Sequence, residues 1–530
     1  MRTSGAQTLS RRGRDVKVMA GSERHDGDRG LILPVVLVIL MLLAMVGMAF
    51  SLATRAELGA SAARANRMQT RLVAEAGVQR ILLMLRENRA KMSYWWDNPE
   101  LSRVQVWPPA TEAEEFGTRD QRYDEDEEGE SEQRGTRWRY SIIATDLDLA
   151  EVEDERPIRY GIQDESGKLN INWAMRDELL ALFLAVLPPD LPIEELVDAL
   201  IDWRDPDEMT SPAGAESDYY LQLMPPYRSG NAPLKTVEEL LLVKGFKAKV
   251  VYGEDYNRNG ILDPSEDDGM ETFPPDDGDG VLNRGLLPYV TVYSIGQDRA
   301  SDNKPRIYLN AKPEEIELLL VELLDSDLAE LILQARSAGY VFKSPAELAG
   351  DLKVKGETIE MEIAPEDVLL AMDRLTTIPR PSNMGPMGTM MAAPLPHVIN
   401  VNTAPPPVLA CLGLIDEQIE QIISARSQLS DEEKISPGWL INEGVMTPSE
   451  LAAFTGPKLD GLRIVTQSWQ FTVESVGYGD HIGMVCRLQV VIEMQGQVPL
   501  IKYFRNLTKL GPGWPLRVEE VTREITGTIG

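Results

Sequence analysis

Residues that commonly carry catalytic or zinc chemistry are scarce in this sequence. Its 530 residues include three histidines and two cysteines. The histidines, His25, His397 and His481, lie far apart in the sequence, and no Cys or His spacing matches a zinc site. The sequence also lacks a nucleophile elbow and a phosphate-binding loop. These absences favour a protein that is not an enzyme.

The two cysteines, Cys411 and Cys486, fall in unlike patterns. Cys411 lies in an apolar helical stretch and Cys486 in an alternating, strand-like one. We expect two buried thiols, although spacing alone leaves a disulfide open.

Positive charge is also scarce. The chain has 53 Lys and Arg against 84 Asp and Glu, a formal net charge of −31. Contacts to nucleic-acid phosphates need clustered Lys and Arg, so no nucleic-acid partner is expected. An acidic surface suits a compartment rich in divalent cations.

Long apolar stretches are limited to residues 31–52, directly after Arg29-Gly30. About 20 apolar residues can cross a bilayer as a helix. Seven Lys and Arg against four acids precede the stretch, which predicts a cytoplasmic N-terminus and a single-pass inner-membrane protein whose bulk is periplasmic. A processing site between Gly30 and Leu31 would remove a leader, residues 1–30, and leave the membrane helix in place.

Helical periodicity continues beyond the membrane and predicts one helix over residues 31–92, with its regular part ending near Arg89. Apolar residues recur at spacings of three and four. They are Leu58, Ala62, Ala65, Met68 and Leu72, then Ala74, Val78, Ile81 and Leu85. We expect one nearly continuous stripe that packs beside other helices.

Strand-like alternation flanks a long helical block. It occurs at residues 137–144 and 156–163 in the first flank (93–165), and the acidic run 124–132 is expected to be a loop. In the second flank (461–530), residues 469–476, 483–494 and 498–505 predict an antiparallel meander. The fold class is therefore α+β.

The helical block, residues 166–460, repeats in three units, about 166–250, 300–376 and 397–460. Each unit opens with an Asn-containing segment, at residues 169–172, 308–311 and 399–404. A later helix in each opens with a capping-box pattern, Thr236 to Glu239, Ser344 to Glu347 and Thr447 to Glu450. Residues 377–396 form the linker before the third unit.

An insertion, residues 251–287, contains a complete EF-hand-type loop. Its expected calcium ligands are Asp255, Asn257, Asn259, Ile261 (through its carbonyl), Asp263 and Glu266. Gly260 permits the sharp turn. Flanking helices are not expected, because residues 250–252 have an extended pattern. Hard oxygen ligands predict calcium as a structural cofactor.

Two further acidic clusters could bind calcium, or could be solvated loops. The candidate second site comprises Asp276, Asp277, Asp279 and Asn283, and the candidate third site Asp202, Asp205, Asp207, Glu216 and Asp218. Neither has a standard spacing.

Residues 240–246 resemble the turn of a helix-hairpin-helix, whose backbone amides can bind phosphate. DNA binding is one interpretation, and a helical packing unit is the other. The acidic surroundings favour packing.

In combination, several of these segments resemble protein K of the type II secretion system, the largest minor pseudopilin family. The resemblance runs from Arg29 to about Asn506 and is carried by the Gly30 junction and residues 164–170, 200–205, 214–220, 226–228 and 399–405. It implies a pilin-like fold, a long N-terminal membrane-spanning helix on an antiparallel sheet, interrupted by a large helical domain of helix-hairpin-helix or SAM-like repeats. It also implies bound calcium and cleavage by prepilin peptidase. Implied partners are pseudopilins I and J, the major pseudopilin, the inner-membrane assembly platform and secreted substrate proteins.

The resemblance also implies a position at the tip of the pseudopilus. Pilin-like subunits usually carry Glu at the fifth residue of the mature chain, where it pairs with a neighbour's N-terminal amine, and here the fifth residue after Gly30 is Val35. The expected function is to initiate or cap assembly of a pseudopilus. The alternative is a type IV pilus-like minor pilin for adhesion or DNA uptake.

Overall fold

The computed structural model describes residues 32–107, 137–145, 147, 158–272, 276–354, 356–359, 363–379, 394–457, 461–480 and 483–513. The chain divides between Ala65 and Asn66 into two compact units. Gly30, Leu31, the acidic run 124–132, His25 and His481 lie outside the described residues.

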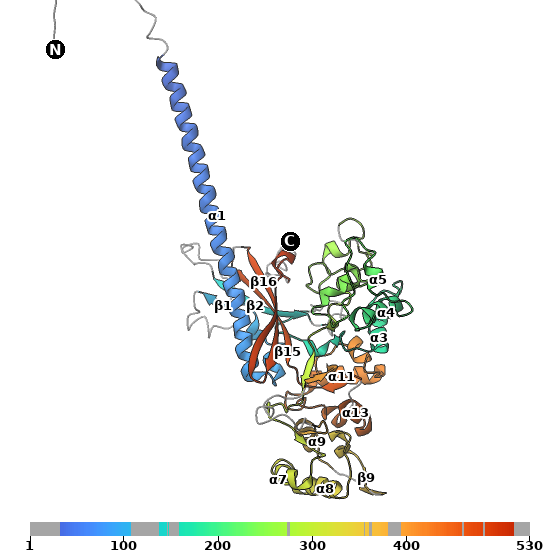
Figure 1. Ribbon diagram of the computed structural model, residues 1–530. Coiled ribbons are helices and arrows are strands. Elements are labelled where there is room, and N and C mark those ends of the chain that lie inside the picture. Colours follow the sequence, from blue (N-terminus) through green and yellow to red (C-terminus); the bar gives the residue numbers. More distant parts are fainter. Residues whose placement is uncertain are drawn as a thin grey trace, which may run out of the picture. The chain divides into compact units, whose positions relative to one another are not determined.

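Helix α1, Ile32–Asn88, confirms the expected continuous helix (Figure 1). It is the one helix in the described part of the chain that is long and apolar enough to cross a membrane. Val35 and its apolar neighbours are exposed along it, as a lipid-facing stretch requires.

The predicted continuous stripe on α1 is wrong. Ala74, Val78 and Ile81 are buried, whereas Met68 and Leu72 are exposed. The step of two residues from Leu72 to Ala74 turns the helix by about 200°, since each residue turns it by about 100°. The two runs of apolar residues therefore lie on different faces, and only the second packs on the sheet.

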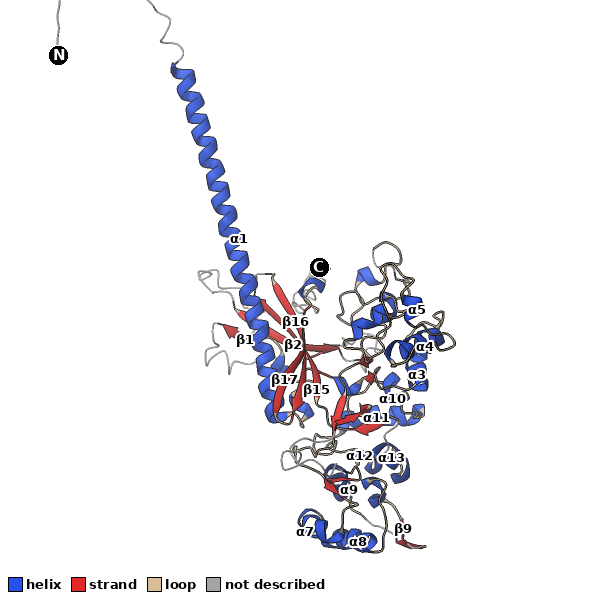
Figure 2. Cartoon of the chain, in the orientation of Figure 1, coloured by secondary structure: helices blue, strands red, loops and turns tan. Residues whose placement is uncertain are grey.

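That sheet is antiparallel and has the order β1-β2-β15-β16-β17 (Figure 2). Its strands are β1 (Val104–Trp107), β2 (Trp138–Thr145), β15 (Gln470–Gly479), β16 (Val485–Gln495) and β17 (Val498–Asn506). The predicted C-terminal meander is confirmed. Strand β1 was not predicted, and residues 156–163 form two short strands, β3 (Ile158–Arg159) and β4 (Gln163–Asp164), instead of one.

Helix α1 approaches β15 closely because a glycine lies on each side of the interface. A Cβ on Gly77 would lie 2.4 Å from Ser475 Oγ, and one on Gly477 would lie 2.3 Å from the carbonyl oxygen of Thr70. Ser475 Oγ donates to the carbonyl of Ala74 at 2.8 Å. Glycine at both positions lets the helix and the strand make this contact.

Each unit of the helical block opens and closes with a pair of short parallel strands. The pairs are β5 (Leu169–Asn170) with β6 (Val290–Thr291), β8 (Ile307–Tyr308) with β11 (Leu375–Thr376), and β13 (Val398–Asn400) with β14 (Arg463–Val465). The two ends of each unit therefore lie side by side.

The first pair of helices is alike in all three units. The pairs are α3 (Arg176–Val186) and α4 (Ile193–Arg204), α7 (Pro313–Leu323) and α8 (Ser326–Ser337), and α10 (Pro406–Ala410) and α11 (Asp416–Gln428). An arginine in the second helix, Arg204, Arg336 or Arg426, donates to carbonyls just after the unit's first strand. An arginine at the equivalent position thus attaches the helix pair to the first strand in each unit.

The remaining helices differ among the units. The first unit has α5 (Ser217–Tyr220), the 3₁₀ helix η5 (Val237–Leu242) and α6 (Ala248–Tyr252). The middle unit has η7 (Pro345–Ala349), a hairpin of β9 (Leu352–Val354) and β10 (Glu357–Ile359), and α9 (Pro365–Arg374). The third has α12 (Trp439–Asn442) and α13 (Pro448–Thr455).

The capping box predicted at Thr447 is confirmed, but the other two are not formed. Thr447 Oγ1 accepts from the amide of Glu450, and Glu450 accepts from the amide of Thr447. Glu239 and Glu347 instead accept from the amides of Lys235 and Lys343, one residue earlier. Both of those segments are 3₁₀ helices, whose tighter turn changes which amide the glutamate reaches.

The first and third units share one hydrophobic core, whereas most of the middle unit's buried apolar residues form a separate one. The middle unit is joined to the rest through strands β7 (Ile295–Gln297) and β12 (Pro394–Pro396), which pair antiparallel. Both cysteines are free and buried, as expected.

Candidate metal centre

The EF-hand-type loop begins just after helix α6 and ends in the 3₁₀ turn η6 (Pro264–Glu266). The expectation that residues 250–252 are extended is wrong. Val250 and Val251 are buried in the core shared by the first and third units. Tertiary packing therefore overrides the preference of valine for strands.

The loop turns its side-chain oxygens inward. Both oxygens of Asp255 accept backbone amides, from Asn259 and Gly260 at 2.9 Å. Glu266 accepts from the amides of Tyr256 at 2.9 Å and Asp263 at 3.2 Å. Gly260 has a φ of +72°, which only glycine adopts without strain. The sharp turn at the sixth position is thus present.

The donor set fits a hard cation. Asp255, Asn259 and Glu266 are buried, and burial raises the pKa of both carboxyls. A divalent cation would offset that cost, and carboxylate, amide and carbonyl oxygens are what calcium prefers. In this conformation Asn257 and Asn259 donate their amide nitrogens to Asp263. Calcium would need their oxygens instead.

Two arginines attach the loop to its surroundings. Arg487, on β16 of the sheet and 1% exposed, donates to the carbonyls of Asn257 at 2.8 Å and Arg258 at 2.6 Å. It also pairs with Glu474 on β15. Arg284 donates to the carbonyl of Gly260 at 3.2 Å. The loop is therefore held directly against the sheet.

The second candidate cluster does not converge. Asp276 accepts the amides of Gly269 and Gly278, while Asp277 and Asp279 are exposed and accept amides two residues ahead. Asn283 does the same with Gly285. These side chains close local turns.

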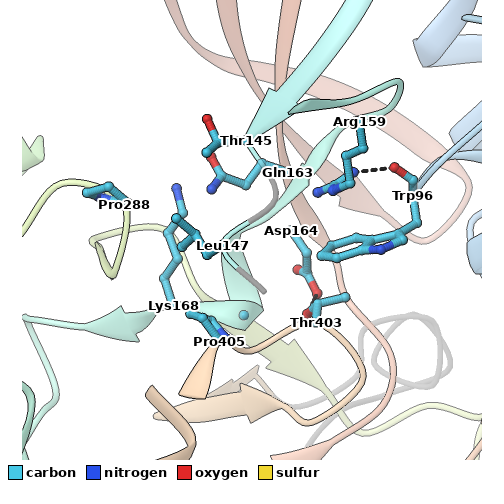
Figure 3. A pocket seen from close by; sticks show the side chains of 11 residues that line it. Trp96, Thr145, Leu147, Arg159, Gln163, Asp164, Lys168, Pro288, Thr403 and Pro405 are labelled. Atoms are coloured by element: carbon cyan, nitrogen blue, oxygen red, sulfur yellow. Dashed lines mark hydrogen bonds between the residues drawn. The ribbon is translucent and has the colours of Figure 1, made fainter. Parts of the chain in front are cut away.

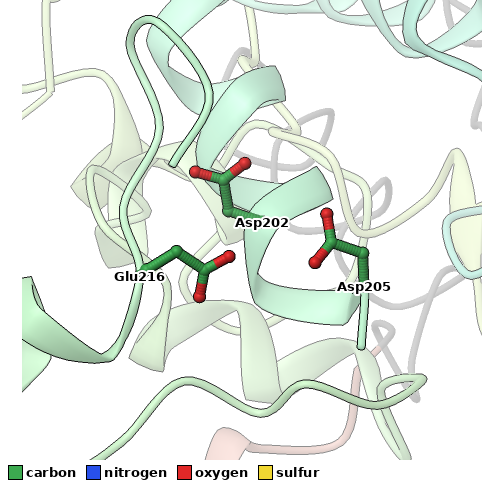
Figure 4. Close-up of side chains that lie close together, drawn as sticks. All are labelled: Asp202, Asp205 and Glu216. Carbon is green, nitrogen blue, oxygen red and sulfur yellow. The ribbon is translucent and has the colours of Figure 1, made fainter. Parts of the chain in front are cut away.

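The third candidate cluster contains the one group of three carboxylates in the described residues whose oxygens lie within 4.8 Å of one another. It consists of Asp202, Asp205 and Glu216, here called the acidic triad (Figure 4). Asp202 lies in the last turn of α4, Asp205 follows that helix, and Glu216 precedes α5. Asp207 and Asp218, also predicted, are exposed and are not part of this group.

Glu216 is the unusual member of the triad. It is 3% exposed, and both of its oxygens are buried without a hydrogen-bond partner in the described structure. Burial, followed by the negative charges of Asp202 and Asp205, raises the pKa of Glu216 to about 7. A buried unpaired carboxylate among other carboxylates is costly unless a cation neutralises it. The triad therefore fits a divalent cation.

Sequence reasoning missed two acids near these clusters. Glu208 accepts the amide and hydroxyl of Ser217, and its charge also raises the pKa of Glu216. Glu254 is buried beside the EF-hand-type loop and pairs with Lys249 at 3.4 Å. In the sequence, the only sign that these acids belong to the clusters is that each lies directly next to a predicted ligand.

A polar junction joins the sheet to the third unit of the block (Figure 3). Asp164, at the end of β4, accepts hydrogen bonds from Thr403 Oγ1 and Ser468 Oγ at 2.6 Å and from Asn400 Nδ2 at 2.8 Å. Burial raises the pKa of Asp164, and these donors oppose the rise. Its neighbour Glu165 binds Lys168 and Thr472. This arrangement fixes the position of the sheet relative to the third unit of the helical block.

The turn at residues 240–246 makes hydrogen bonds to other segments of the first unit. Lys244 Nζ donates to the carbonyls of Ala213 at 3.1 Å and Gly214 at 3.0 Å. Its backbone amide donates to the Tyr220 hydroxyl at 3.1 Å. These contacts favour the packing interpretation over phosphate binding.

Helix α1, the antiparallel sheet and the helical block between β4 and β15 define a mixed helix-and-sheet protein with one candidate membrane-spanning helix in its described part. Residues 167–252 match the family model for the first domain of protein K of the type II secretion system. The first unit of the helical block therefore contains a domain of the type II secretion protein K family.

The chain is similar to one in the crystal structure of the GspK-GspI-GspJ complex from the enterotoxigenic Escherichia coli type 2 secretion system, with a TM-score of 0.38 and 11% identity. The match covers 84% of this chain and 98% of that one. No curated protein sequence matches the chain significantly.

Proposed function

We propose that this protein is a minor pseudopilin of type II secretion that stands at the tip of the periplasmic pseudopilus, where it initiates or caps assembly for export of folded proteins across the outer membrane. The observation that carries the proposal is the protein K domain at residues 167–252, in a chain whose membrane helix has no acidic residue at its fifth position.

The valine at position 35 supports the proposed position at the tip of the pseudopilus. A charged carboxylate inside the bilayer costs about 2.5–3.5 kcal/mol unless it is paired. A subunit at the tip has no neighbour above it to supply an amine, so valine at this position removes the cost and loses no contact. The exposed apolar setting of Val35 on α1 is consistent with this role.

The size of the helical block supports the same position. Three units are inserted between strands β4 and β15 of a single sheet. Such a block would clash with neighbouring subunits inside a helical shaft, whereas the end of the filament leaves it free. We further propose that the three units are helix-hairpin-helix or SAM-like packing modules.

Assembly of this kind requires processing and partners. We propose that prepilin peptidase cleaves between Gly30 and Leu31, and that the mature chain has its N-terminus at the cytoplasmic side of the inner membrane. Its proposed partners are pseudopilins of the I and J types, the major pseudopilin, the assembly platform and secreted substrates. The role is structural and needs no catalytic group.

Calcium is the proposed cofactor. The EF-hand-type loop offers Asp255, Asp263 and Glu266 with amide and carbonyl oxygens, and the acidic triad offers three carboxylates of which Glu216 is unpaired. When bound, calcium would neutralise these buried acids and fix the loops that carry them.

Stoichiometry in purified pseudopili tests the tip assignment. The expected result is about one copy per filament, found at an end by immunogold labelling. Copies distributed along the shaft would contradict it. Cells carrying Val35→Glu are expected to assemble fewer pseudopili, whereas Val36→Leu, a neutral change at the next residue, leaves assembly unchanged.

A further inference from the structure

A cavity of about 130 Å³ lies between the sheet and the first unit of the helical block. On β16, Gln489 and Val491 line the cavity, whereas Val490 packs on the opposite face of the sheet with residues of α1. The first unit supplies the other wall, which includes Tyr293, a residue that follows β6. The cavity is therefore on the face of the sheet that α1 does not cover.

The cavity is large enough for one small ligand. A water molecule needs about 10–15 Å³ of such a space, so there is room for about ten groups of that size. Ligand sites in proteins are commonly concave, with aromatic side chains and a few polar groups in their walls. The chemistry of these walls indicates which ligand would fit.

The charged side chains in the walls are already bound within the protein. Each of the three glutamates that line the cavity is paired with a basic side chain: Glu165 with Lys168, Glu238 with Arg505, and Glu474 with Arg487. Asp255 accepts two backbone amides, Arg284 donates to a carbonyl, and Arg258 lies 3.7 Å from Glu238. A charged ligand would find no unpaired counter-charge among these described residues, so a neutral ligand is favoured.

Four neutral polar side chains in the walls are available to a ligand. Gln163, Gln489, Tyr293 and Tyr503 are half-buried, and no side-chain hydrogen bond is formed by any of them within the described part of the chain. Side-chain amides and phenols both donate and accept hydrogen bonds. Hydroxyl groups do the same, so a ligand with several hydroxyls matches these side chains.

Two tyrosine rings add an apolar surface to the cavity. The ring centroids of Tyr293 and Tyr503 lie 6.4 Å apart, with the ring planes tilted by 36°. Tyrosine combines an apolar ring with a polar hydroxyl. A sugar ring has the same combination, since it carries hydroxyls around its edge and C–H groups on its faces.

A peptide fits this cavity less well. Strands β15 and β16 are paired on both sides, so the sheet presents side chains to the cavity and keeps its backbone groups for its own strands. An extended peptide binds best at a free strand edge, where its amides and carbonyls are paired. In this cavity most of those groups would have no regular partner.

We propose that the cavity between the sheet and the first unit is a binding site for a neutral saccharide. Gln163, Gln489 and the two tyrosine hydroxyls bind the hydroxyls of the sugar, and the tyrosine rings contact its C–H groups. This site goes beyond the proposed function and does not depend on it. A free sugar and the end of a glycan chain share the required chemistry.

Saturation-transfer NMR tests the site, with the full-length chain in phosphatidylcholine nanodiscs, because many detergents carry sugar headgroups that would compete. The probes are glucose, N-acetylglucosamine and a disaccharide of each. We expect magnetisation transfer to the ring protons of at least one probe, with a dissociation constant of about 1 mM or lower. Binding of the single sugars supports a free sugar as the ligand, and binding of a disaccharide alone supports a glycan chain.

Substitutions in the walls locate the binding. Tyr293→Phe with Tyr503→Phe is expected to raise the dissociation constant at least about fivefold, because two hydrogen bonds to the sugar are lost. Gln489→Met removes the amide at similar volume and should weaken binding in the same direction. Tyr94→Phe, the same change at an exposed tyrosine of the 3₁₀ turn η1 (Met92–Tyr94), is the control and should leave the affinity unchanged. Melting curves check that each variant is folded.

Three outcomes would overturn the saccharide site. Transfer to none of the probes would mean that the cavity holds only water. An affinity that stays the same in the folded tyrosine and glutamine variants would place the binding elsewhere on the protein. A neutral capped tripeptide that binds in the cavity when no sugar does would assign the cavity to a peptide.

Discussion

The EF-hand-type loop and the acidic triad contain the same kinds of side chain in opposite surroundings. In the loop, Asp255 accepts two backbone amides, and nearby Arg487 and Arg284 oppose the rise in its pKa caused by burial. In the triad, every neighbouring charge that acts on Glu216 is negative and raises its pKa further. The loop satisfies its own acids, whereas the triad leaves Glu216 without a hydrogen-bond partner in the described structure.

The difference shows that ligand spacing and the need for a cation are separate properties. A twelve-residue pattern specifies a turn whose backbone amides donate hydrogen bonds to the carboxylates. The triad has no such pattern, and its three acids meet only because α4 and the segment before α5 are packed together. Cation removal should therefore affect the two regions differently, and the following experiments are arranged from the largest expected effect to the smallest.

Arg487→Met is expected to destabilise the protein by about 3–5 kcal/mol, because it removes the buried partner of the half-buried Glu474. It also removes the link between the sheet and the loop carbonyls. Chemical denaturation of the detergent-solubilised chain measures the change. Arg71→Met, which breaks an exposed pair, is the control and should cost about 0–1 kcal/mol. Equal losses in both variants would show that attachment of the loop to the sheet is unimportant.

Calcium is expected to stabilise the chain by about 2.7 kcal/mol per site at 100 times the dissociation constant. Melting curves with calcium and with chelator measure this difference. Asp255→Ala and Glu216→Gln should each remove part of it, and the double variant nearly all. A calcium response that survives Glu216→Gln in full would remove the triad from the cation sites.

Without calcium, stability should fall as pH rises from about 4.5 to 7, by up to about 1.4 kcal/mol per pH unit for one group. The pKa of Glu216 is raised in the folded state to about 7, so the unfolded chain releases this proton first. Glu216→Gln should flatten the slope in chelator. Asp279→Asn, an exposed acid of the second cluster, should not.

Gly260→Ala is expected to cost about 1–2 kcal/mol, because its φ of +72° is unfavourable for residues with a Cβ. The new Cβ would also lie 2.7 Å from Thr145 Cγ2. Gly269→Ala has a similar φ of +73° but open space around it, so comparing the two variants isolates the contact with β2. Denaturation midpoints measure both, and an equal loss would mean that the contact adds nothing.

Much of the fold could be predicted because its long elements have strong periodicity. Helix α1 and the C-terminal meander follow directly from the helical and alternating patterns. Local patterns gave wrong predictions where contacts between distant residues determine the structure. Val250 and Val251 are helical because they are buried in a core. On α1, the two-residue step from Leu72 to Ala74 moves the apolar residues to a different face of the helix.

The candidate sites show the same limit. All the candidate EF-hand ligands lie in one loop, so their spacing alone could single them out as a prediction. Five acids were proposed for the third cluster, but only Asp202, Asp205 and Glu216 converge, because the helix ends decide which side chains meet. Arg487 could not be anticipated at all, since 230 residues separate it from the carbonyl of Asn257 that it binds.

The strand pair at the base of the middle unit brings the two ends of that unit together. Gln297 and Pro394 are direct partners across β7 and β12, and most of the buried apolar residues beyond them form a core of their own. A short turn could bridge this pair without disturbing the sheet. Deleting the middle unit at this pair would keep the sheet and helix α1, but it would expose the side of α13 that packs on η7.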